Sequence, residues 1–108
     1  MINNCPFTVW PGFCGKSPSN PGFKLPFNGG WAMTSKQTVS IDLPSDYMAA
    51  RIWGRTNCAT TNGKFSCETG DCGPSVQCGG KWGETHVTLA EFAFSIIIIY
   101  RLLDKKLI

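Results

Sequence analysis

The sequence has little of what metal sites, nucleic-acid surfaces and membrane anchors are usually made of. It contains a single histidine, His86, which lies beyond the main group of cysteines. Zinc ligands usually come in closely spaced pairs completed by Cys or His, whereas eight residues separate Cys58 from Cys67 and five separate Cys72 from Cys78. We therefore expect neither a metal site nor a cofactor, and we assign His86 no function.

Clustered charge and long apolar runs are also missing. Charged residues make up 16% of the chain, the net charge is +3, and the basic residues before the tail are scattered. A nucleic-acid surface would instead show a basic stripe, so we expect no nucleic-acid partner. The longest apolar run, residues 92–100, is about half the length of a membrane-spanning helix. It predicts either a buried strand or, if exposed, a segment prone to aggregation.

Cysteine, by contrast, is abundant. Six cysteines in 108 residues, together with twelve glycines and seven prolines, are typical of a secreted domain stabilised by disulfide bonds. A domain of this size buries a limited core, so covalent links contribute substantially to its stability. We therefore expect an extracellular, monomeric protein, made with a secretory signal that this sequence does not contain.

The clearest predicted strand covers residues 38–43. Polar and apolar side chains alternate there, so that the three apolar residues share one face of the strand. A shorter strand is predicted over residues 7–10, because Pro11 and the glycine after it are expected to end the run. Both runs favour sheet structure.

Two further segments alternate in the same way. Residues 48–56 predict a strand that directs Arg51 and Ile52 to opposite faces. A hairpin-turn dipeptide follows at Asn62 and Gly63, which favours a local disulfide bond across the turn. Residues 88–94 alternate again, although so short a run could also begin a helix.

Four blocks of the sequence resemble the thaumatin-like proteins in order and spacing: NCPFTVW at residues 4–10, RIWGRTNC at 51–58, CETGDC at 67–72 and TLAEF at 88–92. The sequence departs from the family signature at Pro74, where a second glycine is usual. The resemblance implies an all-β fold, a flattened antiparallel β-sandwich with disulfide-rich loops. A full-length member is considerably longer, so we expect a partial thaumatin-like domain over residues 2–94 and a divergent apolar tail over residues 95–108.

The resemblance also implies which cysteines form disulfide bonds. It pairs Cys58 with Cys67 and Cys72 with Cys78. Cys5 would ordinarily bond a cysteine close to the family's C-terminus, and this chain contains no such residue. Cys14 is not a common framework position, so Cys14 and Cys5 could both be free, or they could bond each other.

Two residues match an acidic cleft that many thaumatin-like proteins use to bind β-1,3-glucan. The cleft consists of an arginine, a glutamate and three aspartates; Arg51 and Glu91 match the first two, and the aspartates lie downstream of the point where this sequence departs. Glycoside hydrolysis normally needs two carboxyl groups. Asp71 is a poor partner because it belongs to a turn, and Asp104 has no claim to replace the missing residues. We therefore assign no catalytic residue.

The resemblance implies a secreted antifungal defence protein that binds β-1,3-glucan or other components of the fungal wall or membrane. The alternatives are an endo-β-1,3-glucanase in a full-length product and a non-catalytic interaction protein. Without the resemblance, Arg51 and Glu91 could simply form an exposed ion pair worth about 0 to 1 kcal/mol. The tryptophans are interpreted as packing residues rather than sugar platforms: Trp10, Trp31, Trp53 and Trp82.

Overall fold

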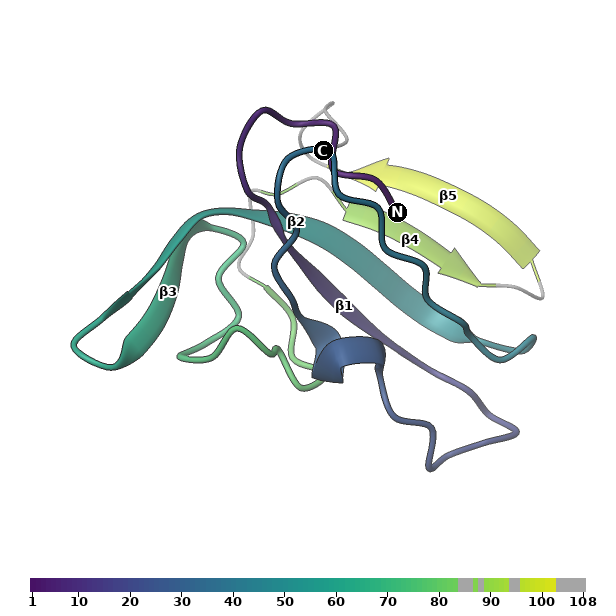
Figure 1. The fold of residues 1–108 in the computed structure, drawn as a ribbon. Coiled ribbons are helices and arrows are strands. Elements are labelled where there is room, and N and C mark those ends of the chain that lie inside the picture. Colours follow the sequence, from purple (N-terminus) through teal and green to yellow (C-terminus); the bar gives the residue numbers. More distant parts are fainter. Residues whose placement is uncertain (84–86, 88, 94–95, 103–108) are drawn as a thin grey trace.

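The chain folds mainly into antiparallel β-sheet. The computed structural model describes residues 1–83, 87, 89–93 and 96–102. They form five strands and one short 3-10 helix: β1 (Trp10–Lys16), η1 (Pro26–Gly29), β2 (Met48–Thr61), β3 (Lys64–Thr69), β4 (Leu89–Ala93) and β5 (Ile96–Leu102). Strands β1, β2, β4 and β5 are neighbours in that order, and β3 pairs with the last part of β2 (Figure 1). The all-β prediction is therefore confirmed. No helix among these residues is long and apolar enough to cross a membrane.

Strand β2 connects the two parts of the sheet. Its first part pairs with β1 on one side and β4 on the other, while its last part pairs with β3. Asn62 and Gly63 make the turn into β3 with φ values of 52° and 78°, as a tight hairpin turn requires. The strand predicted over residues 48–56 and the hairpin turn are thus confirmed. The ambiguous run at residues 88–94 contains a strand, β4.

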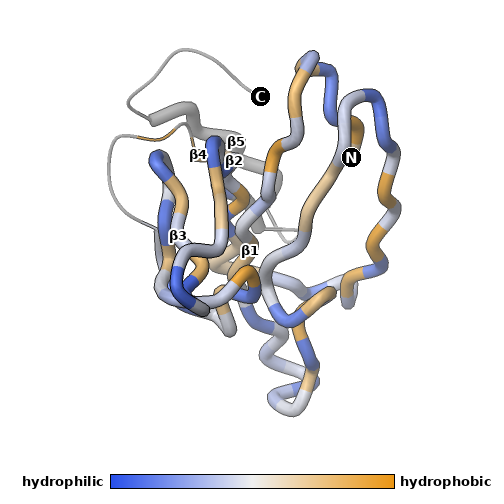
Figure 2. Tube along the Cα trace, turned by 60° about the vertical axis from the view of Figure 1, so that its left-hand side comes forward, coloured by the Kyte–Doolittle hydropathy of each residue, from blue (hydrophilic) through white to orange (hydrophobic). Residues whose placement is uncertain are grey.

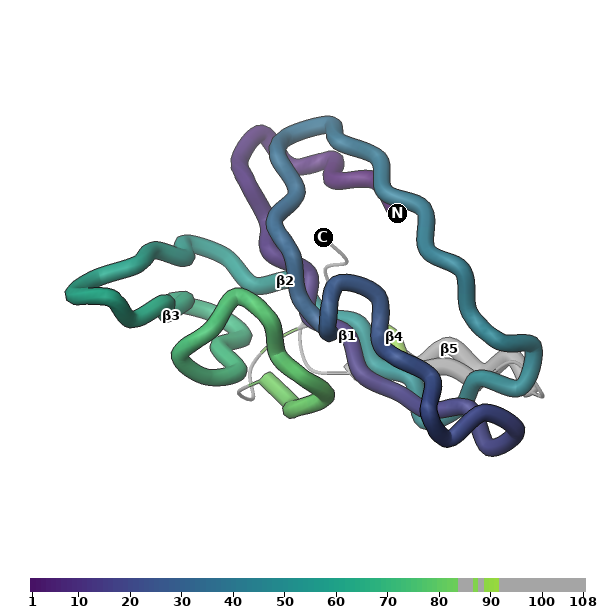
Figure 3. Tube along the Cα trace, turned by 60° about the horizontal axis from the view of Figure 1, so that its bottom comes forward, coloured from purple at the N-terminus to yellow at the C-terminus, as the bar shows by residue number. Residues whose placement is uncertain are grey.

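The strand predicted over residues 38–43 is wrong. Thr38 forms only an isolated bridge with Ile2, and Val39 exchanges backbone hydrogen bonds with Met1. Figure 3 shows the N-terminal segment (purple) beside the segment that follows η1 (blue to teal). The predicted face is right, since the three apolar residues of the run pack half-buried against the core. Alternation reports which side chains are buried, whereas a strand also needs a continuous hydrogen-bonded neighbour.

The short strand predicted over residues 7–10 is also wrong, because β1 continues through Pro11 and Gly12. Proline can lie in a strand at the edge of a sheet, where its missing N–H is not required, and the Pro11 carbonyl accepts a hydrogen bond from Arg55. A Cβ atom at Gly12 would lie 2.4 Å from the ring of Trp53. In this chain the Pro-Gly pair therefore lies within β1, where Gly12 allows the close contact with the Trp53 ring, and it does not end the strand.

The sheet buries apolar residues on both faces. One cluster contains Phe13, Trp31, Met33, Tyr47 and Ala50, and the other contains Cys14, Trp53, Cys72, Cys78 and Val87. Successive residues of a strand point to opposite faces, which is why neighbouring residues of β1 and β2 belong to different clusters. Figure 2 shows apolar (orange) and polar (blue) residues interspersed along the described chain.

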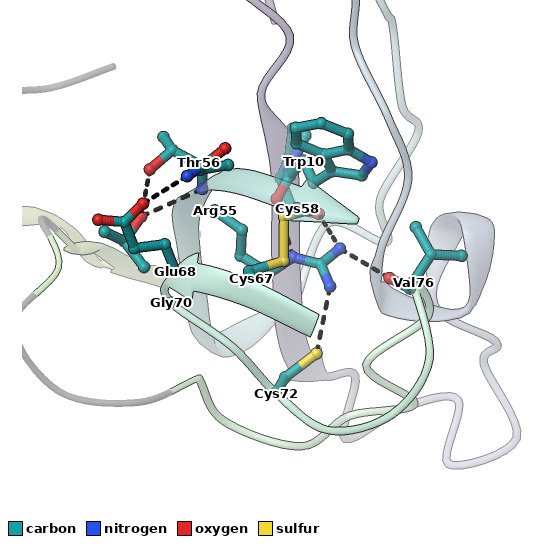
Figure 4. The surroundings of a disulfide bond; sticks show 12 residues. Trp10, Arg55, Thr56, Cys58, Cys67, Glu68, Gly70, Cys72 and Val76 are labelled. Atoms are coloured by element: carbon teal, nitrogen blue, oxygen red, sulfur yellow. Dashed lines mark hydrogen bonds between the residues drawn. A yellow bond between two sulfur atoms is a disulfide. The ribbon is translucent and has the colours of Figure 1, made fainter. Parts of the chain in front are cut away.

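A fully buried arginine joins β1, β2 and the second disulfide loop. Arg55, with 0% of its surface exposed, donates hydrogen bonds from Nε to the Trp10 carbonyl at 2.9 Å and from Nη2 to the Pro11 and Val76 carbonyls at 3.2 and 2.6 Å. Its Nη1 lies 3.4 Å from the sulfur of Cys72 (Figure 4). Burial lowers the pKa of this guanidinium, partly offset by the charge of Asp71. These bonds supply the polar partners that a buried charged group needs.

Replacing Arg55 should therefore destabilise the fold strongly. In Arg55→Met the partly buried carbonyls of Trp10 and Val76 lose this donor, while the buried Pro11 carbonyl still accepts from the Trp31 N–H at 3.4 Å. Each unsatisfied buried group costs about 1–3 kcal/mol. We expect the free energy of unfolding, measured by urea denaturation, to fall by at least about 3 kcal/mol. Arg55→Lys should restore only part of this free energy, because an ammonium group cannot reproduce the planar set of N–H donors of a guanidinium. Lys64→Met, which removes an exposed cation, is the control. A loss in Arg55→Met no larger than in this control would contradict the assigned role.

A second polar anchor has a pH signature. Asp46 accepts hydrogen bonds from the Ser17 hydroxyl at 2.6 Å and the Ser19 N–H at 2.8 Å, and these bonds to the charged form lower the pKa of the Asp46 carboxyl. Because this pKa is lower in the folded chain than in the unfolded one, the stabilisation is present above about pH 4 and is lost on further acidification. The melting temperatures of wild type and Asp46→Asn should differ near neutral pH and converge towards about pH 2. A difference in melting temperature that stays the same at all pH values would contradict this assignment.

Candidate functional site

Strands β2 and β4 bring the two cleft residues named from the sequence into contact. Arg51 and Glu91 are direct partners in the antiparallel register, and residues opposite each other in such a pair share one face of the sheet. Arg51 Nε lies 3.1 Å from Glu91 Oε1, and each side chain keeps 25% of its surface exposed. The pair is therefore formed and still open to solvent on one side.

A third residue completes the surface. The Cζ atom of Arg51 lies 3.2 Å from the centroid of a Trp82 ring, an arrangement in which the cation is attracted to the aromatic face. Trp82 is nevertheless 63% exposed. We refer to these three residues as the Arg51–Glu91–Trp82 site.

The interpretation of all four tryptophans as packing residues is wrong for Trp82. Trp31 and Trp53 are buried, and Trp10 is partly buried. The local sequence carried a signal for this exception. Two glycines and a lysine precede Trp82, a glycine follows it, and the segment shows no apolar periodicity. Such surroundings are typical of a surface loop rather than a packed strand.

The chain on either side of Trp82 is held in place. Before it, Cys78 is buried and Gly79 donates a backbone hydrogen bond of 2.8 Å to Asn28. After it, a Cβ atom at Gly83 would lie 2.5 Å from Nε1 of Trp53, so only glycine fits against that indole. These two anchors determine where the Trp82 side chain leaves the loop.

Four of the six cysteines form disulfide bonds and two are free. Disulfide bonds join Cys58 to Cys67 and Cys72 to Cys78, the pairs that the resemblance implies, while Cys5 and Cys14 are both free. Cys14 is buried and is the partner of Arg51 in β1. Burial raises the pKa of the Cys14 thiol despite the nearby arginine. A neutral buried thiol is a poor nucleophile, so it contributes packing at this site.

The three side chains provide complementary chemistry. An arginine supplies several N–H donors, a carboxylate accepts hydrogen bonds, and an indole offers a flat apolar surface. This combination suits a neutral ligand that carries hydroxyl groups around an apolar ring. Asp71, the other carboxylate considered from the sequence, acts on Arg55 instead. His86 and Asp104 lie outside the described residues.

Comparison with known proteins decides the family. A sequence model of the Thaumatin family matches residues 3–100. The chain belongs to the thaumatin family. Its curated relatives include an osmotin-like protein of Solanum lycopersicum, 39% identical over 92 residues, or 85% of this chain and 35% of the relative. A thaumatin-like pathogenesis-related protein 2 of Avena sativa is 43% identical over 78 residues, or 72% of this chain and 40% of the relative.

A solved structure supports the same conclusion for the fold. The thaumatin-like xylanase inhibitor TLXI superposes with a TM-score of 0.62 at 36% sequence identity, over 85% of this chain and 56% of that chain. The predicted thaumatin-like fold is therefore confirmed. This thaumatin-family chain spans less than half the length of the curated relatives above, 35% and 40% respectively. Pathogenesis-related proteins are among those relatives, which places the chain in a defence-related family.

If the site of this thaumatin-family chain serves binding, its ion pair should contribute little to stability. A double-mutant cycle with Arg51→Ala and Glu91→Ala should give a coupling of about 0 to 1 kcal/mol in the free energy of unfolding, because both groups are partly hydrated. The measurement is urea denaturation of wild type, both single variants and the double variant. A coupling above about 2 kcal/mol would instead identify the pair as mainly structural.

Proposed function

We propose that this chain is part of a secreted, antifungal defence protein that binds β-1,3-glucan of fungal walls through the face carrying Arg51 and Glu91. The observation that supports this most directly is the formed but open ion pair, 3.1 Å long and a quarter exposed on each side chain. An open pair keeps a donor and an acceptor available to a ligand.

Secretion is supported by the disulfide bonds. Two such bonds in 108 residues are typical of oxidising compartments and rare in cytosolic proteins. The cross-strand bond between Cys58 and Cys67 also braces the β2–β3 hairpin, which projects away from the rest of the sheet (Figure 1). A rigid, exposed hairpin suits a protein that functions outside the cell.

The proposed role is binding without hydrolysis. A glycosidase needs a general acid and a second carboxyl group about 5 to 9.5 Å away. Within the described site Glu91 is the one carboxylate, and its Oε1 lies 3.1 Å from Arg51 Nε, so the site as described does not supply the pair of carboxyl groups. Endo-β-1,3-glucanase activity would belong to a longer product that contains further carboxylates.

A second candidate is a non-catalytic inhibitor of glycoside hydrolases. It is favoured by one observation, the structural similarity to a protein described as a xylanase inhibitor. In that case the partner would be another protein, and a projecting surface such as the β2–β3 hairpin would make the contact. Inhibition of a purified xylanase, without retention on glucan, would favour this candidate.

Sedimentation with insoluble polysaccharides tests the proposed function. We expect wild type to be retained by β-1,3-glucan, Arg51→Ala to bind at least about tenfold more weakly because a charged donor is lost, and no reducing sugar to be released. Lys64→Ala, at the exposed hairpin tip, is the matched control for loss of a cation and should bind normally. Absence of retention, or equal retention of Arg51→Ala, would refute the proposal.

A further inference from the structure

We propose that the exposed face of Trp82 is the surface on which a pyranose ring of the glucan stacks, with Arg51 fixing the indole from the opposite side. The inference rests on the proposed function and names a residue that contacts the ligand. It starts from two observations: Trp82 is 63% exposed, and the Arg51 guanidinium lies only 3.2 Å from its ring.

The exposure of Trp82 is unusual for so large an apolar side chain. An indole contributes substantial hydrophobic stabilisation when it is buried, and the two neighbouring anchors, Cys78 and Gly83, are themselves packed against the core. The two ends of the loop thus pack against the core, while its largest side chain, Trp82, is exposed to water.

Other exposed aromatic residues in the described part of the chain have different surroundings. Phe27 lies against Trp31, with ring centroids 4.9 Å apart. Phe7 lines a separate shallow hollow with Trp10 and Asn57. Trp82 is the exposed aromatic residue that touches the Arg51–Glu91 pair, so its position combines stacking with hydrogen bonding.

The ring is fixed before a ligand arrives. One face is covered by the guanidinium, which is itself held by Glu91 through Nε and Oε1 at 3.1 Å. The opposite face is therefore the one available to a ligand. Immobilising a side chain in advance removes an entropic cost that binding would otherwise carry.

Polar groups lie beside that apolar surface. The contact with Glu91 joins Nε of Arg51 to Oε1 of Glu91, and the same two side chains also carry two Nη groups and Oε2. These are N–H donors and a carboxylate acceptor. They are suited to hydroxyl groups at the edge of a stacked ring.

The ligand class follows from the shape of the sugar. In a β-linked glucose ring the hydroxyl groups are equatorial, which leaves axial C–H groups on both faces and makes each face flat and apolar. A ring with an axial hydroxyl, such as galactose, presents a polar group on one face. Either face of a β-linked glucose ring can therefore stack on Trp82, whereas galactose offers only one apolar face, so Trp82 should favour β-linked glucans over galactans.

The test compares Trp82→Leu and Trp82→Phe with wild type in calorimetric titrations with a soluble β-1,3-linked gluco-oligosaccharide. We expect Trp82→Leu to bind about 5- to 10-fold more weakly and Trp82→Phe to bind within about threefold of wild type. Melting temperatures should be unchanged because the side chain is exposed. Phe27→Leu, an exposed aromatic residue away from the site, is the matched control and should bind as wild type does.

A second readout is spectroscopic. Stacking should shift the fluorescence emission of wild type to shorter wavelength on addition of the oligosaccharide, and the shift should be lost in Trp82→Phe. If wild type binds glucan but Trp82→Leu binds equally well, the inference fails and the proposed function stands. If wild type binds no glucan at all, both fail.

Discussion

The rest of the structure depends on the hydrogen bonds of the buried Arg55 guanidinium. Its bonds to the Pro11 and Val76 carbonyls connect an edge strand to a loop far away in the sequence. The fit around it is tight, because a Cβ atom at Gly30 would lie 2.6 Å from Nη2 of Arg55 and 2.2 Å from the Val76 carbonyl oxygen. A buried charge with these partners determines the position of the 72–78 loop, and hence of the chain that leads to Trp82.

The Arg51–Glu91–Trp82 site lies on the same face of the sheet as the second apolar cluster. In β2, Arg51 and Trp53 are two residues apart and so point to the same side. Trp53 is buried and its indole N–H donates to the Gly70 carbonyl at 2.9 Å. The indole thus supports the disulfide loop and, through Gly83, the segment after Trp82. A rigid core beneath an open pair is what a preorganised binding surface requires.

The sequence predicted local features well and non-local ones poorly. The strand at residues 48–56 and the turn at Asn62 follow from periodicity and turn chemistry, which act over a few residues. The strand predicted at residues 38–43 is wrong because strand formation also requires a hydrogen-bonded neighbour, which local periodicity does not reveal. Nothing in a single sequence marks Arg55 as buried, since its partners lie up to 45 residues away. The glycines around Trp82 indicate its exposure, but the contact of its ring with Arg51 depends on how its anchors pack.

Nuclear magnetic resonance of the indole N–H groups tests the central claim most directly. The isotopically labelled chain would be titrated with a β-1,3-linked gluco-oligosaccharide while the assigned tryptophan signals are followed. The account predicts a saturable shift of the Trp82 indole signal, accompanied by the Nε–H of Arg51, with no change at the buried indole of Trp53. An unchanged Trp82 signal at saturating ligand, or equal shifts of all four tryptophans, would contradict it.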